Sequence, residues 1–253
     1  MPASPTIIVV GSANTDMVIK ADKFPLPGET ILGGEFFMFP GGKGANQAVA
    51  ASRLGGNVIL IAKVGNDIFG TQALEQFRKE GIRTDYIISD AAHPSGVALI
   101  TVDAHGENTI VVAQGANGAL SPGDLQKAEM EFEHAEIVLM QLEIPLQTVL
   151  HVAKLAKRHG KKVIVNPAPA MPLPPELFPN LYILTPNKSE TEAITGLKIT
   201  DLSSMQKAAV KISAKGVANV VITLGPEGAY IFSEDGGRQI TTCLLYTSPS
   251  PRD

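Results

Sequence analysis

A glycine-rich turn carrying one lysine and one asparagine is the segment of this sequence best suited to holding a ligand. It runs Gly41-Gly42-Lys43-Gly44-Ala45-Asn46 and leads into an alanine-rich stretch that predicts a helix. Glycines let the backbone close tightly on a ligand, and amides at a helix start can face an anion. The run is neither a Walker A loop nor a G-x-G-x-x-G fingerprint. A plain strand-to-helix turn is the alternative interpretation.

Polar residues also follow two predicted strands. Asn14, Thr15 and Asp16 come shortly after the strand Thr6–Val10, and Glu143 follows the strand predicted at Ile137–Gln141. Ligands of open α/β sheets bind beyond the carboxyl ends of the strands. An amide beside a carboxylate suits vicinal hydroxyls, and Asn14 and Asp16 point the same way if their segment is extended. An Asx turn and a solvated glutamate are the alternatives.

Two later segments suit a nucleotide. Asn187 and Glu190 lie one helical turn apart at a predicted helix start, a spacing that can hold hydrated Mg²⁺ against phosphates or form a capping box. The segment Thr223-Leu224-Gly225-Pro226-Glu227-Gly228 predicts a strand, a glycine turn and a second strand. Such a turn lets a nucleotide approach the backbone, although an ordinary hairpin would look similar.

Short β-branched runs alternate with helical patterns along the chain, which predicts a three-layer α/β/α fold with a mostly parallel central sheet. Helices are expected between the strands, one of them at Leu125–Glu133. Two pairs of strand-like runs have no helix between their members: Met17–Lys20 with Thr30–Met38, and Ser95–Val102 with Thr109–Ala113. We expect these segments, from about 14–38 and 95–113, to form a four-stranded lid.

Composition excludes several classes of function. The 253 residues carry a formal charge of -4 and no basic run longer than Lys161-Lys162, so we expect no nucleic-acid or anionic-membrane partner. The apolar run at Ile7–Val10 is too short for a signal peptide or a membrane span. Cys243 is the single cysteine, which excludes an intrachain disulfide. We predict a cytoplasmic protein.

In their order and spacing these segments resemble the phosphofructokinase-B-like carbohydrate kinase family, and within it the ribokinases. The glycine-rich run at 41–48, with Gly55 and Gly65 downstream, fits the first signature of that family. The wider segments 11–16, 140–143, 166–170, 185–187 and 222–225 are similar to the ribokinases in particular. The resemblance runs from about Thr6 to Ile240, and we expect residues 1–240 to form one kinase domain, incomplete at its C-terminus.

This resemblance implies ATP-dependent phosphorylation of D-ribose at its 5-hydroxyl, with Mg²⁺ bound to ATP and K⁺ as an activator. The implied sugar pocket consists of Asn14, Thr15, Asp16, Gly42, Lys43, Gly44, Ala45, Asn46 and Glu143. The implied ATP contacts are Asn187, Thr223, Leu224, Gly225, Pro226, Glu227 and Gly228, with Glu190 indirectly near Mg²⁺. The lid would close over the sugar and build a homodimer interface. Another sugar or nucleoside kinase is the alternative within the family.

The C-terminus departs from the family pattern. A Gly-Ala-Gly-Asp-like motif, whose aspartate acts as the catalytic base, is expected after this point, and none follows Ile240. Residues 241–253 lack the strand-helix rhythm and resemble a translated sequencing adapter. We therefore predict a truncated kinase with little activity. A non-catalytic sugar-binding or dimerising protein that ends here is the alternative.

Overall fold

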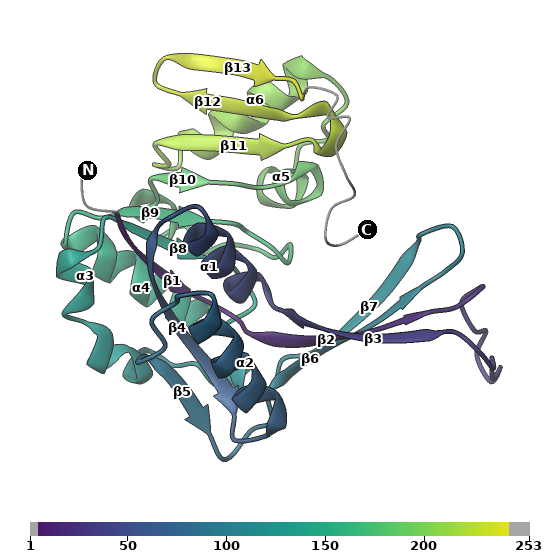
Figure 1. Ribbon diagram of the computed structural model, residues 1–253. Helices are drawn as coiled ribbons and strands as arrows, with labels where there is room; N and C mark the ends of the chain where they lie inside the picture. The colour runs from purple at the N-terminus through teal and green to yellow at the C-terminus, as the bar shows by residue number, and fades with distance from the viewer. Residues whose placement is uncertain (1–4, 243–253) are drawn as a thin grey trace. The chain divides into compact units, whose positions relative to one another are not determined.

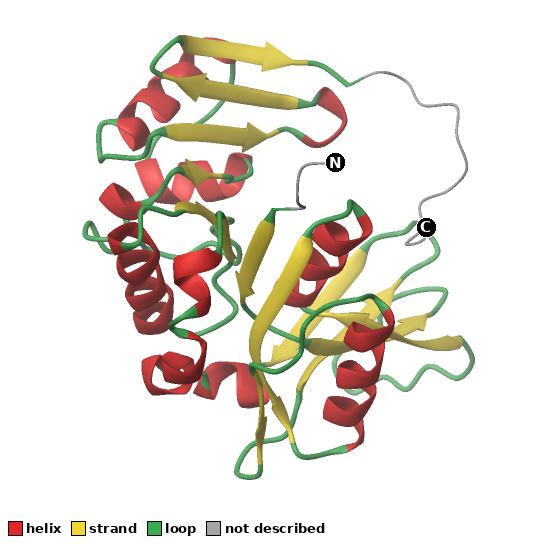
Figure 2. Ribbon diagram, turned by 60° about the vertical axis from the view of Figure 1, so that its left-hand side comes forward, coloured by secondary structure: helices red, strands yellow, loops and turns green. Residues whose placement is uncertain are grey.

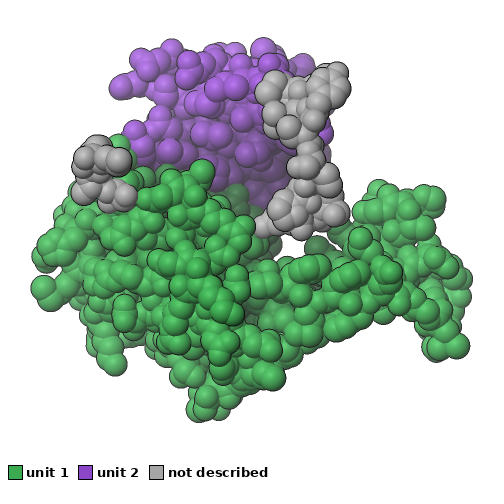
Figure 3. All heavy atoms as spheres, in the orientation of Figure 1, with its two compact units in different colours: residues 1–169 green, residues 170–253 purple. Residues whose placement is uncertain are grey.

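The computed structural model describes residues 5–242, and the chain divides into two compact units, residues 1–169 and 170–253 (Figure 3). The predicted tail at 241–253 lies almost entirely outside the described residues.

The first unit is built on a parallel sheet. In its described part, five strands follow the order β9-β8-β1-β4-β5, and every neighbouring pair is parallel. They are β1 (Thr6–Val10), β4 (Asn57–Gly65), β5 (Ile87–Asp90), β8 (Ile137–Met140) and β9 (Lys162–Val165). Most residues of β1 and β4 and half of those of β8 are buried, as their continuous β-branched sequences predict.

Helices cover both faces of this sheet (Figures 1 and 2). They are α1 (Lys43–Arg53), α2 (Ile68–Lys79), α3 (Glu131–His134) and α4 (Leu146–Arg158). On one face Val9 and Leu60 pack with Ala48 of α1 and Phe77 of α2 in a single buried cluster. α4 lies on the other face and buries Val152 and its neighbours. Burying apolar area on both faces is what holds β1 and β4 at the centre.

The small second sheet has the predicted origin in two segments distant in sequence. Its order is β3-β2-β6-β7, and its strands extend away from the parallel sheet (Figure 1). They are β2 (Asn14–Lys20), β3 (Glu35–Gly41), β6 (Gly96–Val102) and β7 (Asn108–Ala113). The outer pairs are antiparallel, whereas the central pair of β2 and β6 is parallel. We call this sheet the lid.

Two predicted elements differ from the structure. The strand expected at Thr30–Met38 begins only at Glu35, because Gly33 and Gly34 adopt φ values of 102° and 100° that a strand does not allow. The helix expected at Leu125–Glu133 is instead a 3-10 helix, Pro122–Ala128, followed by the short α3. Apolar spacing of three residues fits either helix type, so the sequence pattern could not separate them.

Residues 170–242 form the described part of the second unit. Strands β10 (Ile183–Leu184) and β11 (Asn219–Thr223) are parallel, and β12 (Ala229–Ser233) and β13 (Gly236–Ile240) continue the sheet antiparallel. Helices α5 (Lys188–Thr195) and α6 (Leu202–Ser213) pack on it. Short 3-10 helices lie at Phe178–Asn180 and Gly225–Glu227. In the first unit, another spans Gly115–Ala119, just before that at Pro122–Ala128.

Candidate active site

The glycine turn packs directly on the segment that follows β1. Gly42 has φ 89°, and a Cβ there would lie 2.8 Å from the Asn14 amide nitrogen. Gly44 is as close, since its Cβ would lie 2.5 Å from the Ser12 nitrogen. Larger residues at either position would push these two segments apart. The turn and the end of β1 therefore form one continuous surface.

The first amides of α1 are occupied by protein groups rather than left for a ligand. Lys43 N donates to Glu143 Oε2 at 2.9 Å, Gly44 N to Ser12 Oγ at 3.3 Å, and Ala45 N to the Ser12 carbonyl at 2.8 Å. These are the groups that a helix leaves unpaired at its start. The amides of Lys43, Gly44 and Ala45 therefore do not face a ligand as expected, and a ligand would meet side chains at this helix start instead.

Glu143 is held at the positive end of α1. Its Oε2 accepts hydrogen bonds from Lys43 N and, at 2.5 Å, from Ser12 Oγ. Its other oxygen, Oε1, lies 3.8 Å from Lys43 Nζ, and the Lys43 side chain is 41% exposed. The helix dipole and these donors hold the carboxylate in place. The buried Ser12, which the sequence did not single out, fixes which oxygen is free.

Asn14 and Asp16 lie in β2, so the extended segment on which their common direction depended is present. Asn117 donates through Nδ2 to Asn14 Oδ1 at 2.7 Å. The Asp16 carboxylate lies against Gly41, where an added Cβ would meet it at 2.1 Å. Thr15 alternates to the opposite face of β2. Asn46 is half-buried in the second turn of α1.

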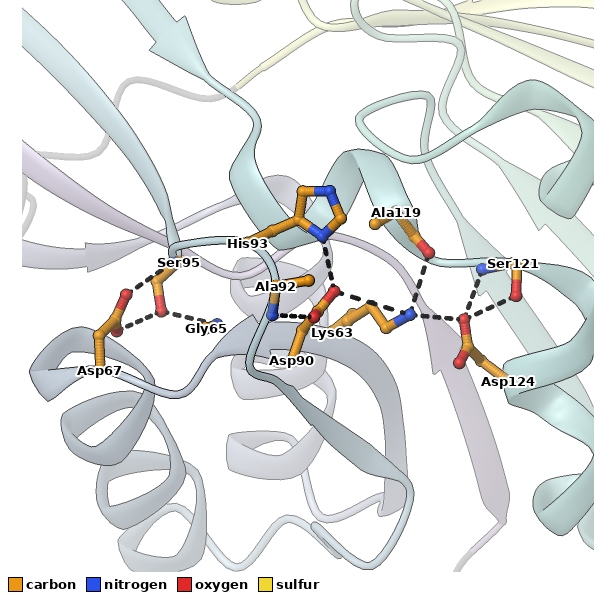
Figure 4. Close-up of polar contacts among 10 residues, drawn as sticks. All are labelled: Lys63, Gly65, Asp67, Asp90, Ala92, His93, Ser95, Ala119, Ser121 and Asp124. Atoms are coloured by element: carbon orange, nitrogen blue, oxygen red, sulfur yellow. Dashed lines mark hydrogen bonds and ion pairs between the residues drawn. The ribbon is translucent and has the colours of Figure 1, made fainter.

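Polar contacts anchor the β6–β7 ribbon of the lid at both ends (Figure 4). Asp67 accepts from the Ser95 amide at 2.8 Å and from the Ser95 hydroxyl at 2.7 Å, just before β6. Burial raises the pKa of Asp67, but hydrogen bonds from Ser95 and Gly70 outweigh it, so this pKa lies below its ordinary value.

The other end of that ribbon is held by Lys63 of β4. Its ammonium donates to the Ala119 carbonyl at 3.1 Å and to Asp124 at 2.9 Å, and lies 3.9 Å from Asp90. Burial raises the pKa of Asp124, but hydrogen bonds from Ser121 and Lys63 bring it below the ordinary value. Asp124 also completes a capping box with Ser121. Figure 4 shows Lys63 between the two carboxylates.

The second unit contains a cavity of about 590 Å³ beside the start of α5. Of the predicted ATP contacts, Asn187, Thr223, Leu224, Gly225 and Glu227 line it, and Pro226 and Gly228 do not. Further lining residues, which the sequence did not single out, are Lys188, Ser189, Glu192, Ile199, Thr200, Asp201, Leu202, Met205 and Gln239. The cavity therefore joins two segments that lie 36 residues apart at Asn187 and Thr223.

Glu190 forms the capping box that was the alternative to a magnesium role. Its Oε2 accepts from Asn187 N at 2.8 Å and its Oε1 from Asn187 Nδ2 at 3.0 Å. Glu190 is 6% exposed and is not among the residues that line the cavity. Among residues 5–242, no cluster of three or more His, Cys, Asp or Glu side chains could hold a metal ion by itself.

The profile of the pfkB family carbohydrate kinases matches residues 4–244 of this sequence. The chain belongs to that family. It is 42% identical over 235 residues to the ribokinase of Haemophilus influenzae, covering 93% of this chain and 77% of that one. It is 36% identical over 230 residues to the deoxyribokinase of Salmonella typhi, covering 90% of this chain and 75% of that protein.

A ribokinase of Arabidopsis thaliana in complex with ribose and ATP superposes on this pfkB-family chain with a TM-score of 0.89 and 30% identity. The superposition covers 97% of this chain and 80% of the plant protein. It confirms the predicted ribokinase-like fold class. In the described part of the chain, no helix is both long enough and apolar enough to cross a lipid bilayer.

Proposed function

We propose that this pfkB-family chain derives from an ATP-dependent kinase that phosphorylates D-ribose at O5 to give D-ribose 5-phosphate. The observation that carries this proposal is the fixed Glu143 carboxylate at the start of α1, with Lys43 beside it and Asn14 and Asp16 on the adjoining strand. These groups combine one cation, two carboxylates and an amide, which together can bind several hydroxyls of one sugar.

The sugar pocket of this proposal is the predicted set at Asn14, Thr15, Asp16, Gly42, Lys43, Gly44, Ala45, Asn46 and Glu143. Lys43 and Asn46 extend it along α1, one turn apart. The second unit would take ATP in the cavity between Asn187 and Thr223, with Pro226 and Gly228 shaping the turn. Phosphoryl transfer depends mainly on such positioning and on neutralising charge.

Mg²⁺ would enter this scheme with the nucleotide, which it requires to neutralise phosphate charge. The described residues offer it no protein cage, which fits an ion that keeps its waters and binds phosphates. Glu190 would act on it only indirectly, since both of its oxygens already accept from Asn187. Activation by K⁺ remains a prediction from the family resemblance.

Titration calorimetry and a product assay test the proposal. We expect the 253-residue chain to bind ribose more tightly than fructose or adenosine. In the product made by the protein completed at its C-terminus, described below, we expect ³¹P NMR to show phosphate on O5. Preference for 2-deoxyribose is the second candidate, favoured by the 36% identity to a deoxyribokinase. A chain that binds no pentose would overturn both.

Little phosphoryl transfer by these 253 residues alone is a further part of the proposal. The match to the Haemophilus influenzae relative covers 77% of that protein, and no Gly-Ala-Gly-Asp-like motif follows Ile240 in this sequence. Replacing the residues after Ile240 with the corresponding C-terminal part of that relative should raise transfer by several orders of magnitude. Equal activity of the two proteins would contradict this.

We also propose that two copies of the chain pair through the lid. Its strands expose large apolar side chains on both faces: Ile19, Phe36, Met38, Phe39, Leu99, Ile110, Val111 and Val112. Exposed apolar patches of this kind mark interaction surfaces. Val111 is 69% exposed, so V111K should convert a dimer to a monomer in light scattering, whereas a monomeric parent would contradict the proposal.

A further inference from the structure

Asn117 is a buried amide that no part of the proposed sugar site accounts for. It lies in the 3-10 helix Gly115–Ala119 directly after β7, and only 1% of it is exposed. We infer that Asn117 is a positioning residue, which fixes the side-chain amide of Asn14 so that its Nδ2 donor, not its oxygen, faces the sugar. This inference rests on the proposed function, because it concerns how the same pocket forms hydrogen bonds with a sugar hydroxyl.

The backbone of Ala13 determines which way round the Asn117 amide must sit. Asn117 Oδ1 accepts from Ala13 N at 2.9 Å, and Asn117 Nδ2 donates to the Ala13 carbonyl at 3.1 Å. A peptide N–H can only donate and a carbonyl can only accept. Exchanging the oxygen and nitrogen of Asn117 would therefore break both contacts in a buried place, which is costly.

The orientation of the Asn117 amide determines that of the Asn14 amide. The second hydrogen of Asn117 Nδ2 points to Asn14 Oδ1 at 2.7 Å, so the atom of Asn14 on that side must be its acceptor. Asn14 is itself only 8% exposed and cannot turn freely. Its Nδ2 group is thereby left as the atom that Asn14 offers to a ligand.

Asn14 and Asp16 then present complementary atoms from the same face of β2. An ionised aspartate only accepts hydrogen bonds, whereas the fixed Asn14 only donates. A sugar hydroxyl both donates and accepts, so one donor and one acceptor side by side suit a pair of neighbouring hydroxyls. If Asn14 were free to flip, the pocket would lose this distinction and with it much of its selectivity.

The amide pair is also packed against the lid. A Cβ at Gly96, the first residue of β6, would lie 2.2 Å from Asn117 Nδ2 and 2.3 Å from Asn14 Oδ1. The hydrogen bond thus passes through space that only a glycine leaves open. The first residue of β6 and Asn117, after β7, therefore converge on the first residue of β2.

Asn117→Asp keeps the shape and the contact with Ala13 N but removes the donor to Asn14 and the donor to the Ala13 carbonyl, the second loss being the same in every background. We expect the dissociation constant for ribose to rise about tenfold or more, with ATP binding unchanged. In an Asn14→Ala background the same substitution should change ribose binding less than twofold, because the residue it acts through is absent. Equal losses in both backgrounds would show a structural role only.

The exposed Asn57, whose Nδ2 donates to Thr6 Oγ1 at 3.1 Å, gives the matched control N57D, for which we expect unchanged ribose binding.

Asn14→Asp provides a second test that spares the fold. The new carboxylate still accepts from Asn117 but presents an oxygen to the pocket, so ribose binding should fall at least tenfold with little change in the unfolding midpoint. Retained binding would overturn the inference. If the parent binds no ribose, the proposed function fails, and NMR still tests the hydrogen bonds that Asn117 donates: we expect slow hydrogen exchange of its side-chain amide, and fast exchange would overturn the inference.

Discussion

The Ser12 hydroxyl donates to Glu143 Oε2 at 2.5 Å and joins the ends of β1 and β8, which are neighbours in the parallel sheet. The two residues are 131 positions apart in sequence. Lys43 N donates to the same oxygen, so the carboxylate has one oxygen engaged by the protein and one, Oε1, beside the Lys43 ammonium. This contact fixes the direction in which the proposed sugar site presents its charge.

Ser12→Ala removes that hydroxyl, and we expect it to weaken ribose binding. A hydrogen bond to a charged group contributes about 1.5–3 kcal/mol, which corresponds to a loss of roughly tenfold to hundredfold in affinity. Titration calorimetry measures it. Ser52→Ala is the matched control, since Ser52 Oγ donates at 2.6 Å to the Glu80 carbonyl at the far end of α1. Similar ribose affinities for the two variants would contradict a role for Ser12 in holding Glu143.

Gly41→Ala tests the position of Asp16. A Cβ at residue 41 would lie 2.1–2.3 Å from the atoms of the Asp16 carboxylate, which must then move. We expect ribose affinity to fall at least tenfold while the free energy of unfolding changes much less. Gly123→Ala is the control, because the nearest atom to its Cβ is Ser121 Oγ at 3.7 Å. Unchanged ribose binding by G41A would show that Asp16 does not contact the sugar.

Local sequence patterns predicted part of this site. Asn14 and Asp16 share a strand face because side chains alternate with a period of two, and Asn187 and Glu190 lie three apart at a helix start. Both arrangements depend on neighbours in the chain. The four strands of the lid were recognisable for the same reason, as turn-linked runs without a helix.

The positioning residues could not be predicted in this way. Ser12 and Asn117 act on partners more than 100 positions away, and only the order of strands brings them together. The occupied amides of α1 depend on the same long-range pairing. Near Gly33 and Gly34 the propensity for strand was overridden by glycine conformation, which the apolar pattern does not reveal.

Lys63→Met tests the ion pairs at the base of the lid. The substitution leaves Asp90 and Asp124 without their cation, and we expect it to lower the free energy of unfolding at pH 7 by about 1–3 kcal/mol. Urea unfolding measures it. The exposed Lys127 supplies the control K127M, for which we expect almost no change. Equal stability of the parent and K63M would contradict the role of Lys63.

Acid should remove the difference in free energy of unfolding between the parent and K63M. The pKa of Asp124 lies below its ordinary value of 3.8 in the folded protein, partly because of Lys63. A lowered pKa contributes stability that is present above the unfolded pKa and lost as pH falls through the folded one. The parent should therefore lose stability more steeply than K63M below about pH 4, and the two should converge. Parallel curves from pH 7 to 3 would show that the pair does not lower this pKa.

Glu190→Gln separates the two roles open to that residue. As a cap, Glu190 binds only Asn187, and glutamine can keep one of the two hydrogen bonds, so E190Q should weaken α5 by no more than about 1 kcal/mol and affect ATP binding equally with and without Mg²⁺. As an indirect partner of the ion, it should matter only when Mg²⁺ is present. We expect the second pattern, a several-fold loss in MgATP affinity that disappears in EDTA. Asp201→Asn is the control, because Asp201 caps α6 in the same cavity wall and should show no such dependence on the metal. An equal loss with and without Mg²⁺ would leave Glu190 as a cap alone.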